Sequence, residues 1–139
     1  MAASSFGVAA PEQCTLATEF LTGATDCCID GSTAACNQAL DERAIPTLYS
    51  SVTLVADALA STASPVTEPT VRNAVANGLA LLMLDVGTGF HFVLVEAVSG
   101  AAYTIADPHY INPVQTDWGT VSSAYGNGSI AQAWRVHTR

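Results

Sequence analysis

The sequence predicts an α+β fold built around a small antiparallel sheet. Two apolar runs, residues 90–98 and 101–106, are rich in β-branched and aromatic side chains and are separated only by Ser99 and Gly100. This pattern is typical of a β-hairpin. Just before the hairpin, residues 79–86 form a continuous apolar run. Such a run is typical of a central strand that is covered on both faces.

Helix signals precede these strands. Residues 69–77 start with a proline, follow a candidate N-cap at Thr67 and end before Gly78, which predicts a short helix. An earlier helix is predicted from Pro11, which suits a first turn, to Gly23, which suits a helix end. We therefore expect an N-terminal helical part that packs on the sheet.

The other segments carry weaker signals. Residues 45–62 fit either a helix or a strand, because their apolar residues follow a helical period while their β-branched residues favour a strand. Polar residues predict loops at 24–41 and 108–118. A short helix near 120–125 and a last strand near 131–138 complete the prediction.

Composition limits the class of protein. The chain has 139 residues, of which 50% are hydrophobic, so we expect a single domain, 1–139, with a real core. A net charge of −8 with only four Lys and Arg argues against nucleic-acid and membrane-surface partners, whose phosphates it would repel. The apolar run 79–84 is too short to span a bilayer. The first residues lack the basic and apolar regions of a signal peptide.

The four cysteines cluster near the N-terminus, at Cys14, Cys27, Cys28 and Cys36. Adjacent cysteines are poorly placed to pair with each other, so Cys27 and Cys28 should each reach Cys14 or Cys36. Two disulfides are therefore favoured, and free thiols or a zinc site are the alternatives. A zinc site would require ligand pairs a few residues apart, which the Cys27–Cys28 adjacency does not supply. We expect no metal and no cofactor.

A candidate acid–base pair lies at the open end of the hairpin. His91 begins the first strand, and Asp107 follows the second. A histidine oriented by a carboxylate can transfer protons, although a buried histidine and a turn aspartate are the structural alternative. Side chains alternate along a strand, so the two meet only if the loop has an odd length or a β-bulge interrupts the pairing. We predict one of these two arrangements.

Several of these features together resemble the second half of papain-like cysteine peptidases, in particular the bacterial bacteriocin-processing and secreted effector-type peptidases. The resemblance rests on the helix 69–77, Gly78, the following strand, a Gly-rich turn, His91-Phe92-Val93-Leu94-Val95 and Asp107-Pro108. Further resemblance to the cysteine-rich segment of the secreted members lies in Gln13-Cys14-Thr15-Leu16-Ala17, Asp26-Cys27-Cys28 and Cys36-Asn37. The matching features cover about residues 11–138.

The resemblance implies a papain-like fold, secreted or extracytoplasmic localisation, and a peptide or protein as substrate or partner. It implies that His91 is the general base and that Asp107 orients it. The nucleophile of this family lies in a segment like Cys-Trp-Ala-Ala-Ser, with a Gln a few residues earlier. Met1-Ala2-Ala3-Ser4-Ser5 resembles the residues after that Cys, while the Cys and the Gln have no obvious counterpart.

Two functions are consistent with these expectations. The first is a cysteine peptidase-like hydrolase that acts on peptides. In it Cys14, close to a predicted helix start, is a candidate replacement nucleophile, although its position also resembles a disulfide position of the secreted members. The second is a catalytically inactive pseudoenzyme that binds a peptide or protein in the residual cleft.

Overall fold

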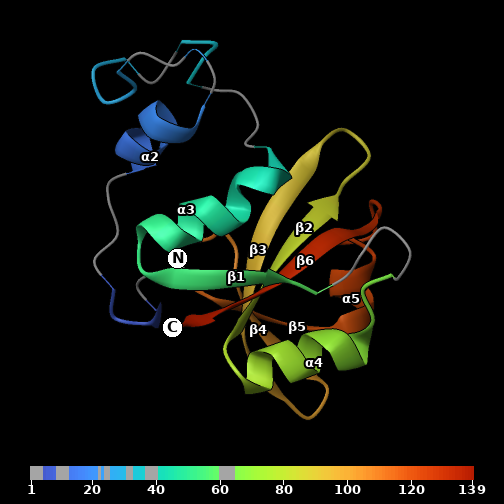
Figure 1. Ribbon diagram of the computed structural model, residues 1–139. Helices are drawn as coiled ribbons and strands as arrows, with labels where there is room; N and C mark the ends of the chain where they lie inside the picture. Colours follow the sequence, from blue (N-terminus) through green and yellow to red (C-terminus); the bar gives the residue numbers. More distant parts are fainter. Residues whose placement is uncertain are drawn as a thin grey trace.

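The computed structural model describes residues 5–8, 13–21, 23, 26–30, 33–36, 41–59 and 65–139. Its helical elements are α2 (Gln13–Phe20), the 3₁₀ helix η1 (Glu42–Ala44), α3 (Ile45–Ser51), α4 (Glu68–Ala76) and α5 (Trp118–Ser122). Its strands are β1 (Leu54–Ala58), β2 (Leu79–Asp85), β3 (Phe90–Ser99), β4 (Ala102–Ala106), β5 (Val114–Asp117) and β6 (Ser129–Thr138). The strands form one antiparallel sheet in the order β1-β6-β2-β3-β4-β5, so the fold is α+β (Figure 1).

Each face of the sheet carries its own apolar cluster. On one face Val71 of α4 and Val121 of α5 pack with Leu82 of β2. On the other face Ile45 of α3 packs with Leu81 of the same strand. The first six residues of β2 are buried, which confirms the predicted central strand covered on both faces. Helices therefore cover both sides of the sheet centre (Figure 1).

The helix predicted at 69–77 is confirmed as α4, with the capping that the sequence suggests. The Thr67 side chain accepts a hydrogen bond from the Thr70 backbone N–H, and a proline occupies the first turn. The segment 45–62, which fitted either a helix or a strand, contains both. Helix α3 ends at Ser51, Thr53 turns the chain with a φ of 63°, and β1 follows.

The prediction of a loop over 108–118 was wrong in its second half. Residues 114–117 form β5, an edge strand that pairs with β4. Its sequence, VQTD, is short and exposed, so it lacks the apolar alternation by which a strand is usually identified. Asp117 then caps α5 by accepting a hydrogen bond from the Thr120 N–H, which starts that helix at Trp118 rather than at 120.

The predicted hairpin is confirmed as β3 and β4, with its loop one residue later than expected. Ser99 pairs with Ala102, so Gly100 and Ala101 form the loop. Gly100 has a φ of 58°, a conformation that favours glycine in a tight hairpin turn.

A β-bulge interrupts the pairing of β3 with β4. An uninterrupted ladder from the loop would place Glu96 opposite Ile105, but the register shifts and Val95 lies opposite Ile105. Beyond the bulge, on the side away from the loop, the shift changes which residues of β3 share a face with which residues of β4. His91 and Asp107 are thereby brought to the same face, as predicted.

Two disulfides link the described segments between residues 13 and 36. Cys14 is bonded to Cys28 and Cys27 to Cys36, which confirms the expectation that Cys27 and Cys28 reach different partners. Two disulfides are typical of proteins from an oxidising, extracytoplasmic compartment. Helix α2 lies away from the sheet in Figure 1. Part of the helix predicted from Pro11 and of the loop 24–41 falls outside the described residues.

Within the described ranges, every helix is too short or too polar to cross a bilayer.

Helix α4 is joined to the hairpin by Tyr103, a fully buried residue of β4. The Tyr103 hydroxyl donates a 2.7 Å hydrogen bond to Glu68 Oε1. Arg72 Nη2 donates to the same oxygen at 2.8 Å and to the Gly100 carbonyl at 2.8 Å, and the guanidinium lies 5.2 Å from the centre of the Tyr103 ring. These contacts hold the helix against the tip of the hairpin.

The Tyr103 contact predicts a specific pH dependence of stability. Burial, together with the Glu68 carboxylate, raises the pKa of Tyr103 from 10.0 to about 12. The unfolded tyrosine therefore ionises at a lower pH than the folded one, so the stabilisation by Tyr103 is complete below pH 10 and is lost as the pH rises toward 12. Tyr103→Phe should lower the free energy of unfolding by about 2 kcal/mol near neutral pH, because the hydrogen bond is to a charged group.

Urea unfolding of both proteins at a series of pH values measures this effect. We expect the difference in the free energy of unfolding between wild type and Tyr103→Phe to shrink above pH 10, because 10.0 is the ordinary pKa of tyrosine. Burial also raises the pKa of Tyr49 to about 12. Because Tyr49 is present in both proteins, its contribution cancels in the comparison. A difference that stays constant across this range would contradict the prediction.

Candidate functional site

The candidate site is built on the His91–Asp107 pair, which the structure brings into direct contact. His91 is the second residue of β3, and Asp107 directly follows β4. Their side chains are joined by a 2.9 Å hydrogen bond between His91 Nε2 and Asp107 Oδ1. The Asp107 side chain is 3% exposed and the His91 side chain 31% exposed. The carboxylate is therefore enclosed by protein, while one part of the imidazole faces solvent.

Asp107 is held by further donors. The His109 backbone N–H donates to Oδ1 at 2.8 Å, and the Tyr125 hydroxyl donates to Oδ2 at 3.1 Å. With His91, three donors from three segments of the chain contact one buried carboxylate. Hydrogen bonds to a charged acceptor are stronger than neutral ones, so the network fixes the plane of the carboxylate.

Tyr125 reaches Asp107 from a turn with an unusual backbone. Ala124, Tyr125 and Gly126 have φ values of 47°, 59° and 83°, three consecutive left-handed residues after α5. A left-handed conformation costs roughly 1–2 kcal/mol for a residue with a Cβ. The turn is stabilised by a 2.9 Å hydrogen bond from the Tyr125 N–H to the Thr120 carbonyl. Strain of this kind is often stored at functional sites.

The electrostatics favour Tyr125 as a donor. Burial raises the pKa of its phenol, and the neighbouring Asp107 charge raises it further. The hydroxyl therefore stays protonated and continues to donate to the carboxylate. Sequence reasoning missed Tyr125 as a site residue, since its only signal was a tyrosine before a Gly-Asn-Gly turn.

A surface depression of about 590 Å³ lies beside the pair. Besides His91 and Asp107, its walls include Thr88, Phe90, His109, Tyr110, Tyr125 and Asn127. A smaller depression of about 210 Å³ continues on the other side of Asp107 and Tyr110, toward Glu96 and Ile111. Phe90, Tyr110 and Ile111 are 59%, 55% and 101% exposed, so apolar surface flanks the pair. The site can accommodate apolar groups of a ligand.

Cys14 is not a free thiol in the structure, which corrects its candidacy as a nucleophile. Its sulfur is bonded to Cys28, and the other two cysteines of the chain are bonded to each other. Cysteine nucleophiles act as thiolates, so a sulfur in a disulfide cannot fill this role. Asp107 is the only hydrogen-bonding partner of the His91 ring among the described residues. The Ser5 hydroxyl donates a 2.7 Å hydrogen bond to Glu96, the residue at the bulge of β3.

A second His–Asp pair provides a comparison within the same molecule. His137 Nε2 lies 2.9 Å from Asp57 Oδ2, the same separation as in the first pair. The Asp57 side chain is 47% exposed, so this carboxylate is open to solvent on one side. The two pairs differ in burial and in supporting donors rather than in distance. Only the His91 pair combines a buried carboxylate with an adjacent depression that both partners line.

The described residues contain no group of three or more His, Cys, Asp or Glu side chains arranged to hold a metal ion. The hydrogen bond between His91 and Asp107 allows proton transfer at an imidazole. Because Asp107 accepts from Nε2, the neutral His91 ring has Nδ1 as its basic nitrogen.

No family model, curated protein or solved structure matches this chain.

Proposed function

We propose that the chain carries the acid–base part of a papain-like, cysteine peptidase-like hydrolase that acts on peptides. The observation that supports this most directly is the buried Asp107 carboxylate, which holds His91 Nε2 at 2.9 Å beside an open depression. The order of the elements agrees with the resemblance, since α4, β2, β3 with His91 and β4 with Asp107 follow one another in the chain.

The chemistry assigns a role to each group. His91 Nδ1 takes the proton of a cysteine thiol, and the thiolate attacks the peptide carbonyl. The imidazolium then donates this proton to the leaving amine as the acyl–nitrogen bond breaks. Asp107 accepts from Nε2–H throughout and stabilises the imidazolium without itself taking the proton. Tyr125 and the His109 N–H hold Asp107 in place.

The nucleophile in this scheme is a thiol other than the four cysteines in disulfides. In the family that the chain resembles, the nucleophile lies directly before a Trp-Ala-Ala-Ser-like segment. Met1-Ala2-Ala3-Ser4 resembles that segment, so the corresponding position is the one before Met1. Residues 1–4 lie outside the described part of the chain.

A second candidate function is peptide or protein binding without turnover. It is favoured by the oxidised state of all four cysteines in this chain and by the exposed Phe90, Tyr110 and Ile111 around the site. Exposed apolar groups that surround a depression are typical of binding surfaces.

The test is a variant in which Cys-Trp replaces Met1, directly before Ala2. We expect a thiol-directed epoxide probe to label the introduced cysteine stoichiometrically and peptide hydrolysis to appear. His91→Ala in this background should lower both rates by about 100-fold or more, as expected for the loss of a general base. His137→Ala is the matched control, because it removes the other aspartate-bound histidine, and should leave both rates unchanged.

The outcomes separate the two functions. Labelling that is equally fast in the His91→Ala variant would show an ordinary surface thiol and would contradict the hydrolase. Absence of labelling, combined with saturable binding of a fluorescent peptide library that Phe90→Ala weakens, would support the binding function instead.

A further inference from the structure

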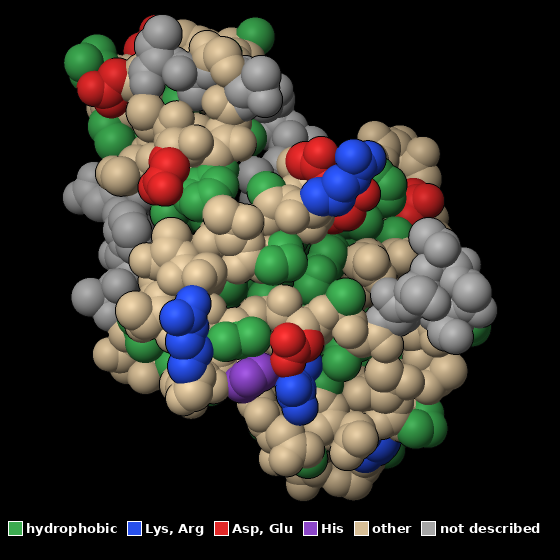
Figure 2. All heavy atoms as spheres, viewed as in Figure 1, with side chains coloured by type: hydrophobic (Ala, Val, Ile, Leu, Met, Phe, Trp, Pro, Cys, Tyr) green, Lys and Arg blue, Asp and Glu red, His purple; other side chains and the backbone are tan. Residues whose placement is uncertain are grey.

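A third hollow lies away from His91, between α4 and strands β1 and β6. It has a volume of about 450 Å³, within the range of small-molecule sites. Its polar wall contains Asp57, Asn73, Asn77 and Arg135, and its apolar wall includes Leu59 and Pro69. Figure 2 shows acidic, basic and histidine side chains together near the centre of this face. We call this hollow the α4 groove.

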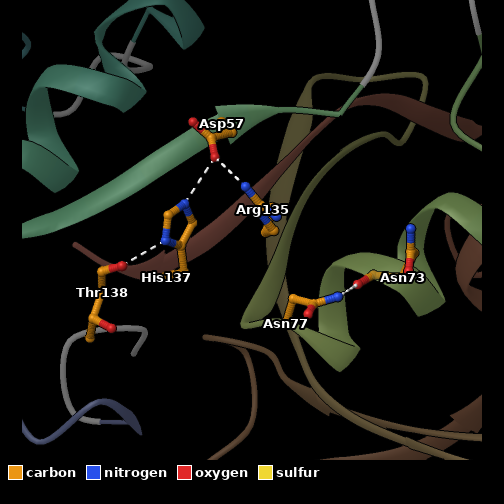
Figure 3. A network of polar contacts seen from close by, with 6 residues as sticks. All are labelled: Asp57, Asn73, Asn77, Arg135, His137 and Thr138. Atoms are coloured by element: carbon orange, nitrogen blue, oxygen red, sulfur yellow. Dashed lines mark hydrogen bonds and ion pairs between the residues drawn. The ribbon is translucent and has the colours of Figure 1, made fainter.

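The polar side chains of the α4 groove are only partly used by the protein. Asp57 Oδ2 accepts from Arg135 Nη2 at 2.7 Å and from His137 Nε2 at 2.9 Å (Figure 3). Asn77 Nδ2 donates to the Asn73 backbone carbonyl at 3.0 Å. Among the described residues, these bonds leave Asp57 Oδ1 and the Asn73 side-chain amide available to a ligand.

Arg135 adds unused donor capacity. Within the described part of the chain, its Nε is buried without a hydrogen-bond partner, and only Nη2 donates to a side chain. A guanidinium has five N–H donors, so most of this capacity is unmatched by protein acceptors. The Arg135 side chain is 37% exposed, so a ligand oxygen in the groove would accept from the exposed part of the guanidinium rather than from the buried Nε.

The charges indicate a neutral ligand. Hydrogen bonds from Arg135 and His137 lower the pKa of Asp57, so this carboxylate is ionised at neutral pH. Its charge is balanced by Arg135 within the groove. An anion would be repelled by Asp57 and a cation by Arg135, whereas a neutral polar ligand meets both donors and acceptors.

We propose that the α4 groove binds a neutral saccharide of one or two rings. A hydroxyl group both donates and accepts hydrogen bonds, which matches the alternation of acceptor, amide and guanidinium around the groove. The carbon face of a sugar ring can rest on Leu59 and Pro69, while its hydroxyls contact Asp57 Oδ1, the Asn73 amide and Arg135. This site is independent of the function proposed for His91.

Titration of ¹⁵N-labelled protein followed by NMR tests the proposal. The probes are methyl α-glucoside, N-acetylglucosamine and cellobiose, with sodium acetate and N-methylacetamide as an anion and a peptide-group mimic. At least one saccharide should saturably shift the signals of Ala58, Asn73 and Arg135 Nε and leave those of His91 and Tyr125 unchanged.

Asn73→Ala should weaken saccharide binding by about five- to tenfold, as expected for the loss of a ligand hydrogen bond. Asn73 is exposed on α4, so this variant should fold normally. Asn112→Ala, a matched change in the loop after β4, should have no effect. Absence of saturable shifts with every saccharide would overturn the proposal. So would equal binding by Asn73→Ala, or saturation only by acetate or N-methylacetamide.

Discussion

Replacing Asp107 with alanine should lower the free energy of unfolding by about 3 kcal/mol and release His91 from its fixed orientation. The change removes the acceptor for three donors, the His109 N–H, the Tyr125 hydroxyl and His91 Nε2. A buried donor left without a partner costs roughly 1–3 kcal/mol, and His91 and Tyr125 recover part of this by contact with water. Urea unfolding at neutral pH measures the loss.

The second His–Asp pair supplies the control. Asp57→Ala removes a carboxylate that also contacts a histidine at 2.9 Å but is 47% exposed. Exposed ion pairs contribute up to about 1 kcal/mol, so this variant should be much less destabilised. NMR of the imidazole protons should show a changed environment for His91 in the first variant and for His137 in the second. Equal losses of stability would contradict the role assigned to burial.

Gly128→Ala should destabilise the fold by about 3 kcal/mol, because there is no room for its side chain. A Cβ at this position would overlap the backbone carbonyl oxygen of Asp85. Asp85 pairs with Ser129 at the end of the β2–β6 ladder, so neither backbone can move without loss of strand pairing. The same displacement would shift the turn that positions Tyr125. Thermal and urea unfolding, with the intrinsic fluorescence of the protein, measure both effects.

Gly126→Ala separates steric overlap from backbone strain in the same turn. A Cβ on Gly126 meets nothing within 4 Å, but its φ of +83° is unfavourable for alanine. This variant should lose about 1–2 kcal/mol, the cost of a left-handed residue. A Gly128→Ala protein as stable as the Gly126→Ala protein would show that the β2–β6 pairing yields to the added methyl group.

Local signals in the sequence were sufficient for the elements at the centre of the fold. Strand β2 is buried on both faces, so only apolar side chains fit and the run is easily recognised. Helix α4 begins with a capping threonine and a proline, signals that act within one turn of the chain. Strand β5 was missed for the opposite reason, because an exposed edge strand imposes no apolar pattern.

The candidate site was predictable only in part. Because side chains alternate along a strand, His91 and Asp107 could meet only if the loop had an odd length or a β-bulge interrupted the pairing. The position of the bulge at Glu96 was not predictable, because the register of β3 against β4 depends on packing across the whole sheet. The catalytic role of the pair remains a prediction.

Four features followed from the sequence alone: the α+β class, the central strand, the hairpin and the different partners of the adjacent cysteines. The folded structure was needed to show that Cys14 is bonded to Cys28, that Tyr125 supports Asp107 and that Asp57, Asn73 and Arg135 surround one groove. The first group follows from propensities and spacings within a few residues. The second joins segments separated in the sequence, so it depends on how the folded chain places side chains together.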